Sequence, residues 1–334
     1  MRVFIDGFGK TIAKKDNQIS FKENDKEIDY VPINDLKQIV IGGKGSITFD
    51  ALRLLAEHDI DCVALDWRGQ LDYRLSPPEK KKAFLKREQY FALLDKRSGI
   101  LAKEFIKAKI KNQRSVLSTL AKSRENNEFL YSMRDKLTDL IKSLEEIKDK
   151  SSDEIRSTIF GIEGTASRDY WAGIAFVIDD KFDFLNRSGR GATDPVNAML
   201  NYGYAVLQSD IWRTVHLAGL DPYCGFLHQD AKGGTSLVFD LMEEFRQQIV
   251  DKSVLSLINR NQITPDDFEE SGAYLKIKRN PRHLLIKTIE DKLNNSIKFN
   301  NKNIKFKDII LYQGRLIGKF LIGEEKYKGF SLRW

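Results

Sequence analysis

Short apolar runs and turn-forming residues alternate along the first 75 residues of the chain. Turn-forming pairs, such as Asp6-Gly7 and Asp16-Asn17, separate five runs that have the apolar content and the length of short β-strands. These runs are Val3–Ile5, Ile12–Lys14, Ile19–Phe21, Ile28–Val31 and Gln38–Ile41. The pattern therefore predicts a small β-rich domain over residues 1–75.

One helix is predicted within this region, over Phe49–Glu57, because its apolar residues recur at intervals of three and four. Thr48 stands directly before it and is a residue type that caps the first turn of a helix. An apolar strand, Cys62–Leu65, follows the helix. The sequence Ser76-Pro77-Pro78 then interrupts any regular element, so residues 76–78 are expected to form a linker.

Beyond the prolines, apolar residues recur at helical intervals as far as the C-terminal end. Residues 181–193 and 221–234 contain clustered Gly, Asn and Pro and are expected to be loops. We therefore predict an α+β fold class, in which the β-rich domain is followed by a larger all-α domain over residues 79–334. The predicted helices are Ala83–Gly99, Ile100–Ala121, Glu128–Asp149, Ser152–Ile178, Asp194–Gly219, Thr235–Asn259, Pro281–Ile297 and Phe306–Ile322.

The composition is that of a soluble globular chain with its own hydrophobic core. Of the 334 residues, 41% are hydrophobic and 31% are charged, which excludes an intrinsically disordered chain. The longest apolar run, Trp171–Ile178, is too short to span a bilayer, and no secretory signal is visible at the N-terminus. Cys62 and Cys224 form neither a metal-binding spacing nor a disulfide framework. We expect a cytoplasmic protein with no membrane partner.

The net charge of +7 is concentrated in one segment of the chain. Residues 79–114 hold 12 lysines and arginines but four acids, an excess of 8, so the remainder of the chain is nearly neutral. Such clustering is expected of a protein that binds a polyanion such as nucleic acid. The alternative is a solvated helix face, on which each charge simply meets water.

Two motifs place a chemically useful residue beside glycines. Glu163 stands in a strongly apolar helical segment between Gly161 and Gly164, and each glycine weakens a helix by about 1 kcal/mol relative to alanine. These glycines suggest close approach by another backbone or by a ligand, or else simple helix packing. His228 follows Gly225 in the second predicted loop and precedes a Gly-Gly turn. A lone histidine is more often structural than catalytic.

A third motif, Asp240–Arg246, carries a pair of acids. Asp240 and Glu243 are three residues apart, so both project from one face of the helix. Acids near the start of a helix are also favoured by the helix dipole. Together, Glu163, His228 and one or both of these acids could surround a divalent cation. Carboxylates with a single imidazole suit Mg²⁺ or Mn²⁺ better than a structural Zn²⁺, so the residues favour a metal-dependent enzyme acting on nucleic acid.

Four motifs occur in order along the second part of the chain. They are Glu163-Gly164-x-Ala166, Asp194-Pro195-x-Asn197, Gly225-x-Leu227-His228 and Ser236-Leu237 followed by Asp240-Leu241-x-Glu243. In this order and at this spacing they resemble the motifs of the CRISPR spacer-acquisition integrases, the universal CRISPR-associated endonuclease family. The resemblance extends over the whole chain. It implies a β-rich N-terminal domain that forms a homodimer and an α-helical C-terminal domain that holds one divalent metal.

The resemblance also implies a catalytic site, its cofactor and its partners. Glu163, His228 and Glu243 match the metal ligands of the family, with Asp240 as a supporting residue and as the alternative third ligand. The metal would be Mg²⁺ or Mn²⁺. The implied reaction joins the 3′-hydroxyls of a short DNA duplex to the CRISPR repeat by transesterification. Two dimers would flank a small ferredoxin-like CRISPR-associated partner protein.

Nine residues are expected to contact double-stranded DNA. Arg187, Arg190 and Lys232 lie in the two predicted loops near the motifs, where they could instead be ordinary loop charges. Tyr170, two helical turns after Glu163, could orient the scissile strand or could simply pack. A track for the duplex is predicted at the start of the basic segment, formed by Lys80, Lys81, Lys82, Lys86 and Arg87.

Three other functions fit parts of the sequence. A non-catalytic nucleic-acid-binding subunit requires only the basic segment 79–114, and it predicts salt-dependent DNA binding without a metal-dependent product. A transposon-type integrase would use the same fold and is expected to carry an added DNA-binding domain. A homodimeric scaffold without a DNA role would leave the basic segment unexplained.

Overall fold

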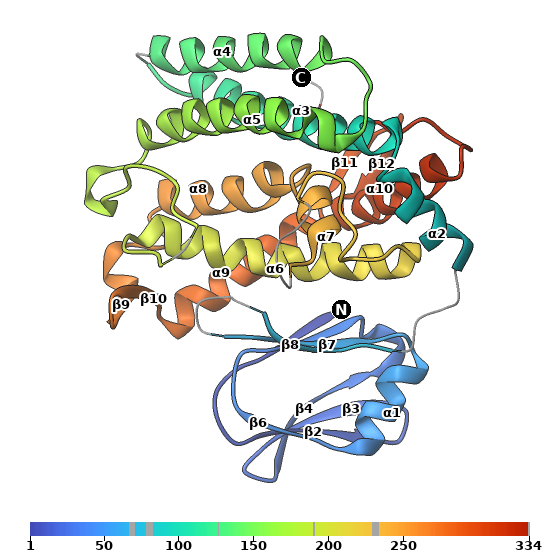
Figure 1. Cartoon of the computed structure of the whole chain (residues 1–334). Helices are drawn as coiled ribbons and strands as arrows, with labels where there is room; N and C mark the ends of the chain where they lie inside the picture. Colours follow the sequence, from blue (N-terminus) through green and yellow to red (C-terminus); the bar gives the residue numbers. More distant parts are fainter. Residues whose placement is uncertain (67–70, 78–82, 126, 190, 229–233, 333–334) are drawn as a thin grey trace. The chain divides into compact units, whose positions relative to one another are not determined.

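The computed structural model describes residues 1–66, 71–77, 83–125, 127–189, 191–228 and 234–332. The chain divides into two compact units, Met1–Lys80 and Lys81–Trp334 (Figure 1). The division falls just after the predicted linker at residues 76–78, of which Pro78 lies outside the described residues. The first unit is β-rich and the second is mainly helical, which confirms the predicted fold class.

Two four-stranded sheets form most of the first unit in the residues that the structure describes. In one sheet, three parallel strands are extended by an antiparallel fourth, in the order β1 (Arg2–Ile5), β5 (Gln38–Ile41), β7 (Asp61–Leu65) and β8 (Leu71–Leu75). In the other sheet, three antiparallel strands are joined by a parallel edge strand, in the order β4 (Lys26–Pro32), β3 (Gln18–Glu23), β2 (Lys10–Lys15) and β6 (Gly45–Ile47).

The two sheets of the first unit share one hydrophobic core. Ile39 and Cys62 contribute to it from one sheet and Ile19 and Phe21 from the other, all of them buried. Helix α1 (Phe49–Glu57) adds its buried apolar face to the same cluster. Each sheet therefore buries one face against common apolar side chains, which is the arrangement that stabilises short strands.

Helix α1 begins as its sequence predicts. The hydroxyl of Thr48 accepts a hydrogen bond from the backbone N–H of Ala51 at 3.2 Å, so Thr48 caps the first turn. This bond satisfies one of the four N–H groups that the start of a helix leaves without an intrahelical partner.

In the described residues of the second unit, nine α-helices form most of the structure. Helices α3, α4 and α5 pack against one another, each contacting both of the others, and α6 packs against α7, α9 and α10 (Figure 1). None of the helices in the described part of the chain combines the length and the apolar content needed to cross a membrane. The helices are α2 (Ala83–Ala92), α3 (Lys96–Lys122), α4 (Glu128–Glu145), α5 (Ser152–Ala175), α6 (Pro195–Ala218), α7 (Ser236–Met242), α8 (Lys252–Asn259), α9 (Arg279–Asn294) and α10 (Phe306–Leu321).

The second unit is not all-α, because its described part also contains two β-hairpins that the helical periodicity did not predict. Their strands have only four residues each, too few for an alternating pattern to stand out from the helices around them. The turn Asn300-Asn301 has positive φ at both residues, 47° and 62°, as a tight hairpin turn requires. The hairpins pair β9 (Phe268–Ser271) with β10 (Tyr274–Ile277) and β11 (Ser296–Phe299) with β12 (Lys302–Lys305).

Several predicted helix boundaries differ from the structure by a few residues, including the end of the predicted helix Pro281–Ile297, where Ile297 belongs to β11, and two differences are larger. The predicted break between Gly99 and Ile100 lies inside α3, which begins instead after Asp95, whose carboxylate accepts a hydrogen bond from the backbone N–H of Arg97 at 2.7 Å. The predicted continuous helix Thr235–Asn259 is interrupted after α7 by a turn and by a π-helical segment, Gln247–Asp251, before α8. Such π-helical segments are frequent at functional sites.

Replacing Thr48 by alanine should destabilise the start of α1 by about 1 kcal/mol, because the first turn loses its side-chain acceptor. Amide hydrogen exchange in α1 measures this effect in the full chain, and faster exchange is expected for Thr48→Ala. Thr48→Ser keeps the hydroxyl and serves as the control. Unchanged exchange in Thr48→Ala would show that the cap contributes nothing.

Candidate metal centre

Three residues that are far apart in the sequence come together in the second unit. Glu163 lies on α5, His228 lies in the loop after α6, and Glu243 follows the last residue of α7. One ligand atom from each lies within 4.8 Å of the other two. Glu243 is buried, whereas Glu163 and His228 are half-buried. One imidazole and two carboxylates at this separation can surround a single divalent cation.

Asp240 holds His228 in position. Its Oδ1 accepts hydrogen bonds from His228 Nδ1 at 2.7 Å and from the His228 backbone N–H at 3.0 Å. Its Oδ2 accepts from the backbone N–H groups of Phe226 at 2.6 Å and Leu227 at 3.0 Å. Because the Asp240 carboxylate can only accept, His228 Nδ1 carries the proton and Nε2 is left as the atom that can bind a metal. These contacts support the expectation that Asp240 orients a metal ligand, His228, without binding the metal itself.

The loop that carries His228 needs a glycine at its start. A Cβ atom on Gly225 would lie 2.6 Å from the Cβ of Ser236 and 2.7 Å from its carbonyl carbon. Any larger residue would therefore push the loop away from the first turn of α7. Close contact with α7 is what brings the next three backbone N–H groups within reach of Asp240.

Two cations that the sequence analysis did not assign to the site neutralise its carboxylates. Lys109 Nζ, from α3, lies 2.5 Å from Glu163 Oε1 and 2.9 Å from Glu243 Oε2. Arg246 Nη2 lies 3.0 Å from Glu243 Oε1. The position of Arg246, three residues after Glu243, was a usable signal, because such pairs share a helix face. The sequence holds no comparable signal for Lys109, since its contacts depend on how α3 packs against α5.

The charges at the site shift the pKa values of its members. Burial raises the pKa of Glu243, but Arg246 and Lys109 outweigh burial and lower it to about 2, so this carboxylate is ionised at neutral pH. Burial lowers the pKa of His228, but the hydrogen bond and the charge of Asp240, together with Glu243 and Glu163, raise it overall. The buried Lys109 has a raised pKa because the same two glutamates outweigh its burial.

The donor atoms fit a hard divalent cation. Glu243 Oε2 is buried and has no hydrogen-bond partner within the described ranges, and its 2.9 Å approach to Lys109 Nζ lies outside hydrogen-bond geometry. A buried carboxylate oxygen left in this way requires an explanation, and a bound cation is one. Two carboxylates with His228 Nε2 form an oxygen-rich set with one nitrogen, which suits Mg²⁺ or Mn²⁺.

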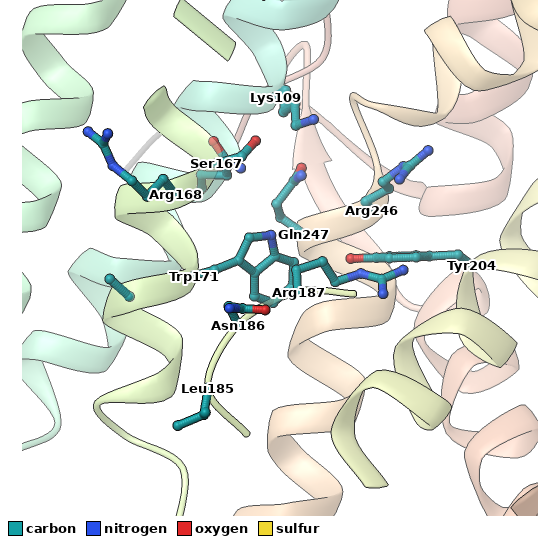
Figure 2. Close-up of a pocket in the computed structure, with 12 residues that line it drawn as sticks. Lys109, Ser167, Arg168, Trp171, Leu185, Asn186, Arg187, Tyr204, Arg246 and Gln247 are labelled. Atoms are coloured by element: carbon teal, nitrogen blue, oxygen red, sulfur yellow. The ribbon is translucent and has the colours of Figure 1, made fainter. Parts of the chain in front are cut away.

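A cavity of about 540 Å³ adjoins this centre. It is lined by four basic side chains and two aromatic rings that come from α3, α5, α6 and the segments after α5 and α7 (Figure 2). Two of the basic residues, Lys109 and Arg246, also contact the candidate ligands, so the cavity lies next to the centre. These six residues are Lys109, Arg168, Trp171, Arg187, Tyr204 and Arg246.

Arg187, which is predicted from the sequence to contact phosphate, lines the cavity. Its Nη2 donates to Asn201 Oδ1 at 2.6 Å, and its guanidinium lies 5.2 Å from the centre of the Tyr204 ring (Figure 2). Burial, together with Arg246, lowers the pKa of Arg187. The side chain is therefore held in place but half-exposed to the cavity, and its contact with phosphate stays a prediction.

Tyr170 does not fit the role of a DNA contact. Its side chain is fully buried, and its hydroxyl donates to Asp251 Oδ2 at 2.7 Å. Tyr204 donates to the other oxygen of the same carboxylate at 2.6 Å. Two helical turns do place Tyr170 on the same face of α5 as Glu163, but at Tyr170 that face is buried in the interior of the protein. Packing, the alternative reading of this residue, accounts for its position.

The predicted duplex track lies mostly outside the described residues. Three of its five residues, Lys80, Lys81 and Lys82, lie outside them. Arg190 and Lys232, the two loop residues that are also predicted to contact DNA, lie outside the described residues as well. Lys86 and Arg87 are on α2, where the guanidinium of Arg87 lies 5.1 Å from the centre of the Phe84 ring. Contact between these residues and DNA stays a prediction.

The glycines beside Glu163 are not packed against another backbone. A Cβ atom on Gly161 or Gly164 would have nothing within 4 Å in the described structure. Neither glycine is therefore required for helix packing, which was one of the two expectations for them. The surface beside Glu163 is left open, as the approach of a ligand would require.

Comparison with known proteins identifies the family. The model of the family described as CRISPR associated protein Cas1 matches residues 3–291. The chain belongs to the Cas1 family. It is 41% identical, over the full length of both chains, to a CRISPR-associated endonuclease Cas1 of Archaeoglobus fulgidus. The resemblance found in the sequence is thereby confirmed.

Two solved structures extend the comparison to the fold. A casposase bound to an integration product matches with a TM-score of 0.84 and 26% identity, over 98% of this chain and 92% of that chain. A chain of a Cas6-RT-Cas1–Cas2 complex matches with a TM-score of 0.82 over 97% of this chain and 35% of that chain, and at 20% identity it shows the shared fold alone. The Cas1 fold therefore covers both units described above.

Replacing Tyr170 by phenylalanine should destabilise the second unit by about 1–3 kcal/mol, because the buried Asp251 carboxyl loses one of its two hydroxyl donors. Thermal unfolding of the full chain measures the loss, with Tyr223→Phe, at a residue that is 62% exposed, as the control. DNA binding below the unfolding temperature should not change. Weaker DNA binding by a stable Tyr170→Phe variant would restore the DNA role.

Replacing Asp240 by asparagine should weaken the binding of Mn²⁺ by about 10–100-fold, because the amide carries no charge and has one accepting oxygen in place of two, so it cannot satisfy all four donors and orients the His228 ring less firmly. Binding requires a neutral imidazole, so affinity should rise as pH increases through the pKa of His228. Because Asp240 raises that pKa, the rise should move to lower pH in the variant. Electron paramagnetic resonance of Mn²⁺ measures both effects.

The exposed Asp139 supplies the control, since its side chain is 74% exposed. Asp139→Asn should bind Mn²⁺ with the affinity and the pH dependence of the unchanged chain. If Asp240→Asn behaves in the same way, Asp240 does not position His228.

Proposed function

We propose that this chain is a metal-dependent DNA integrase and endonuclease of CRISPR adaptation, in which Glu163, His228 and Glu243 hold one Mg²⁺ or Mn²⁺. The observation that carries the proposal is the convergence of these three side chains within 4.8 Å, beside a cavity lined by cations. Membership of the Cas1 family supports it, as does the fold shared with a casposase bound to an integration product.

A divalent ion bound there would polarise a phosphodiester and stabilise the charge that develops on its oxygens. The residues of the chain supply the rest. Asp240 keeps His228 in one tautomer and one orientation. Lys109 and Arg246 stay within ion-pair distance of the ligands and add positive charge on the side where a phosphate would lie.

The proposed reaction needs no nucleophile from the protein. The 3′-hydroxyl of a short DNA duplex attacks a phosphorus atom of the repeat, so one P–O bond forms as another breaks and the displaced 3′-oxygen takes up a proton. The number of phosphodiester bonds is unchanged, and no external energy source is required. Hydrolysis by the same site differs only in using water as the nucleophile, which accounts for an endonuclease activity.

We assign the cavity beside the centre to the DNA strand next to the reacting phosphate. Arg168, Arg187 and Arg246 can neutralise backbone phosphates there, and Trp171 offers a ring on which a base can stack. Arg190 and Lys232 remain part of the proposal as further phosphate contacts. This assignment gives the four cations of the cavity a common partner.

The proposed partners follow from the family. We propose that the chain forms a homodimer through its β-rich unit and that dimers assemble with a small ferredoxin-like CRISPR-associated protein. The fold shared with a chain of a Cas6-RT-Cas1–Cas2 complex is compatible with such an assembly. Size measurement of the purified chain, alone and with that partner, tests this part of the proposal.

Replacing Glu163 by glutamine should reduce strand joining by about 100-fold or more, because the site loses a charged ligand worth several kcal/mol to the transition state. The assay follows a labelled duplex with free 3′-hydroxyls into a plasmid that carries the repeat, with Mn²⁺ and again with EDTA. Glu146→Gln, at an exposed residue, is the matched control. Both variants should retain DNA binding.

Normal joining by Glu163→Gln would overturn the ligand assignment. A different result, the absence of any joined product, would favour the alternative of a non-catalytic nucleic-acid-binding subunit. If the unchanged chain binds DNA with a steep salt dependence but yields no metal-dependent product with its partner present, the chain is a binding subunit and not the enzyme.

A further inference from the structure

A second hollow, of about 920 Å³, lies in the second unit away from the candidate ligands. It is walled by α3, by the hairpin β11–β12, by α10 and by the segment that follows α10. Its lining includes five basic side chains and a single acid, Glu325. That acid lies 2.5 Å from Lys319 Nζ and is therefore already paired. The five basic residues are Lys111, Arg114, Lys298, Lys326 and Lys328.

Helix α3 presents different residues to the cavity at the metal centre and to the second hollow. Lys109 and Gln113, four residues apart, line the cavity at the metal centre. Lys111 and Arg114, three residues apart, line the second hollow. At 3.6 residues per turn, residues two apart point to nearly opposite sides of a helix. The second hollow is therefore a separate basic site and not an extension of the first.

The charge in the second hollow is poorly compensated. The side chain of Lys111 is only 27% exposed, and Glu145 approaches its Nζ only to 4.0 Å, the outer limit of an ion pair. Burial, followed by the charge of Lys107 and a further contribution from Lys328, lowers the pKa of Lys111. An anion placed between Lys111 and Lys328 would stabilise the charged form of Lys111, which burial and the neighbouring lysines destabilise.

The hollow also presents an aromatic ring and amide groups. Tyr312, on α10, is 40% exposed and meets Phe299 edge-on at 5.6 Å between ring centres, which fixes its orientation. Asn300 and Asn301, at the turn of the hairpin, line the same hollow and offer side-chain amides. A ring held in this way beside cations is the arrangement on which nucleobases stack.

The far wall of the hollow is held in place by a buried network. Gln313 Nε2 donates to the carbonyl oxygen of Lys328 at 3.0 Å and to Glu244 Oε2 at 2.8 Å. The same carboxylate accepts from the hydroxyl of Tyr327 at 2.5 Å and from the backbone N–H of Phe330 at 2.8 Å. The segment that carries Lys326 and Lys328 is therefore fixed against α10, so its cations do not have to be ordered when a ligand binds.

We propose that this hollow binds a stretch of single-stranded nucleic acid, with backbone phosphates on Lys111 and Lys328 and a base stacked on Tyr312. Cations that come from three separate elements suit a chain of phosphates better than one compact anion, and the exposed ring suits a base. The site gives the chain a second contact with nucleic acid. It rests on the proposed function only for the identity of the strand as DNA.

The charge contribution is tested with Lys111→Gln/Lys328→Gln and a labelled oligodeoxynucleotide of about 12 residues, a length within the range of known single-strand sites. EDTA is present throughout, so no chemistry occurs. Affinity at low salt should fall on the order of tenfold, and the slope of log affinity against log salt should become shallower by about 1.4, since each single-strand phosphate contact contributes about 0.7. Lys136→Gln/Lys148→Gln removes two exposed charges that line neither hollow and is the control.

The place of binding is tested by cross-linking. Photoreactive p-benzoylphenylalanine in place of Tyr312 should cross-link the labelled oligonucleotide, whereas the same group in place of Phe129, which is also 40% exposed, should not. Equal cross-linking at both positions, or an equal loss of affinity in the two double variants, would overturn the proposal. If inorganic triphosphate binds in a way that depends on Lys111 and Lys328 but the oligonucleotide does not, the ligand is a free polyphosphate and the proposal is wrong.

These outcomes are independent of catalysis. Binding and cross-linking in EDTA can succeed in a chain that never joins DNA, which would leave this site intact and overturn only the proposed function. Conversely, full joining activity in the unchanged chain, with no change of salt slope in Lys111→Gln/Lys328→Gln, would overturn this site alone.

Discussion

The geometry of the candidate centre depends on one buried carboxylate, that of Asp240, because it is the acceptor for four hydrogen bonds from a single loop. Three of the donors are consecutive backbone N–H groups of residues 226–228, and Phe226 and Leu227 are fully buried. Each of these N–H groups would cost about 1–3 kcal/mol if it were buried without a partner. The same carboxylate fixes the His228 ring. Glu163 and Glu243 sit on or beside helices, so the loop is the part of the centre that needs this support.

The turn after α7 contributes residues to two sites of the second unit, the candidate metal centre and the wall of the second hollow. Glu243 points to the candidate centre, where Arg246 and Lys109 lower its pKa to about 2. The next residue, Glu244, points away and accepts hydrogen bonds from Tyr327, Gln313 and the backbone of Phe330. Burial raises the pKa of Glu244 to about 8 in spite of these donors. Two adjacent glutamates thus differ because one faces cations and the other faces neutral donors, and the second anchors the wall of the basic hollow.

How much of this could be predicted from the sequence depended on whether the signal was local. Thr48 caps α1 as predicted, because a cap acts within one turn of its own helix. The candidate ligands could be nominated from motif order, whereas the partnership of Lys109 with Glu163 could not, since it joins two helices whose packing no local pattern encodes. Tyr170 shows the limit of a local signal. Its spacing from Glu163 was correct, but spacing along a helix does not say which part of that face is covered by Asp251 and its neighbours.

The charge of the basic segment 79–114 shows why a count along the sequence overstates a surface patch. Several of its cations are used within the protein, where Arg97 pairs with Glu88, Lys103 with Asp149 and Lys107 with Glu104. Lys109 is buried among the carboxylates of the candidate centre. Because α3 turns by about 100° per residue, the next basic residues along it point in another direction. These residues, Lys111 and Arg114, line the second hollow. In the described part of the segment, six of the nine cations are therefore taken up by ion pairs, by the candidate centre or by the basic hollow, so the charge count overstates the surface patch.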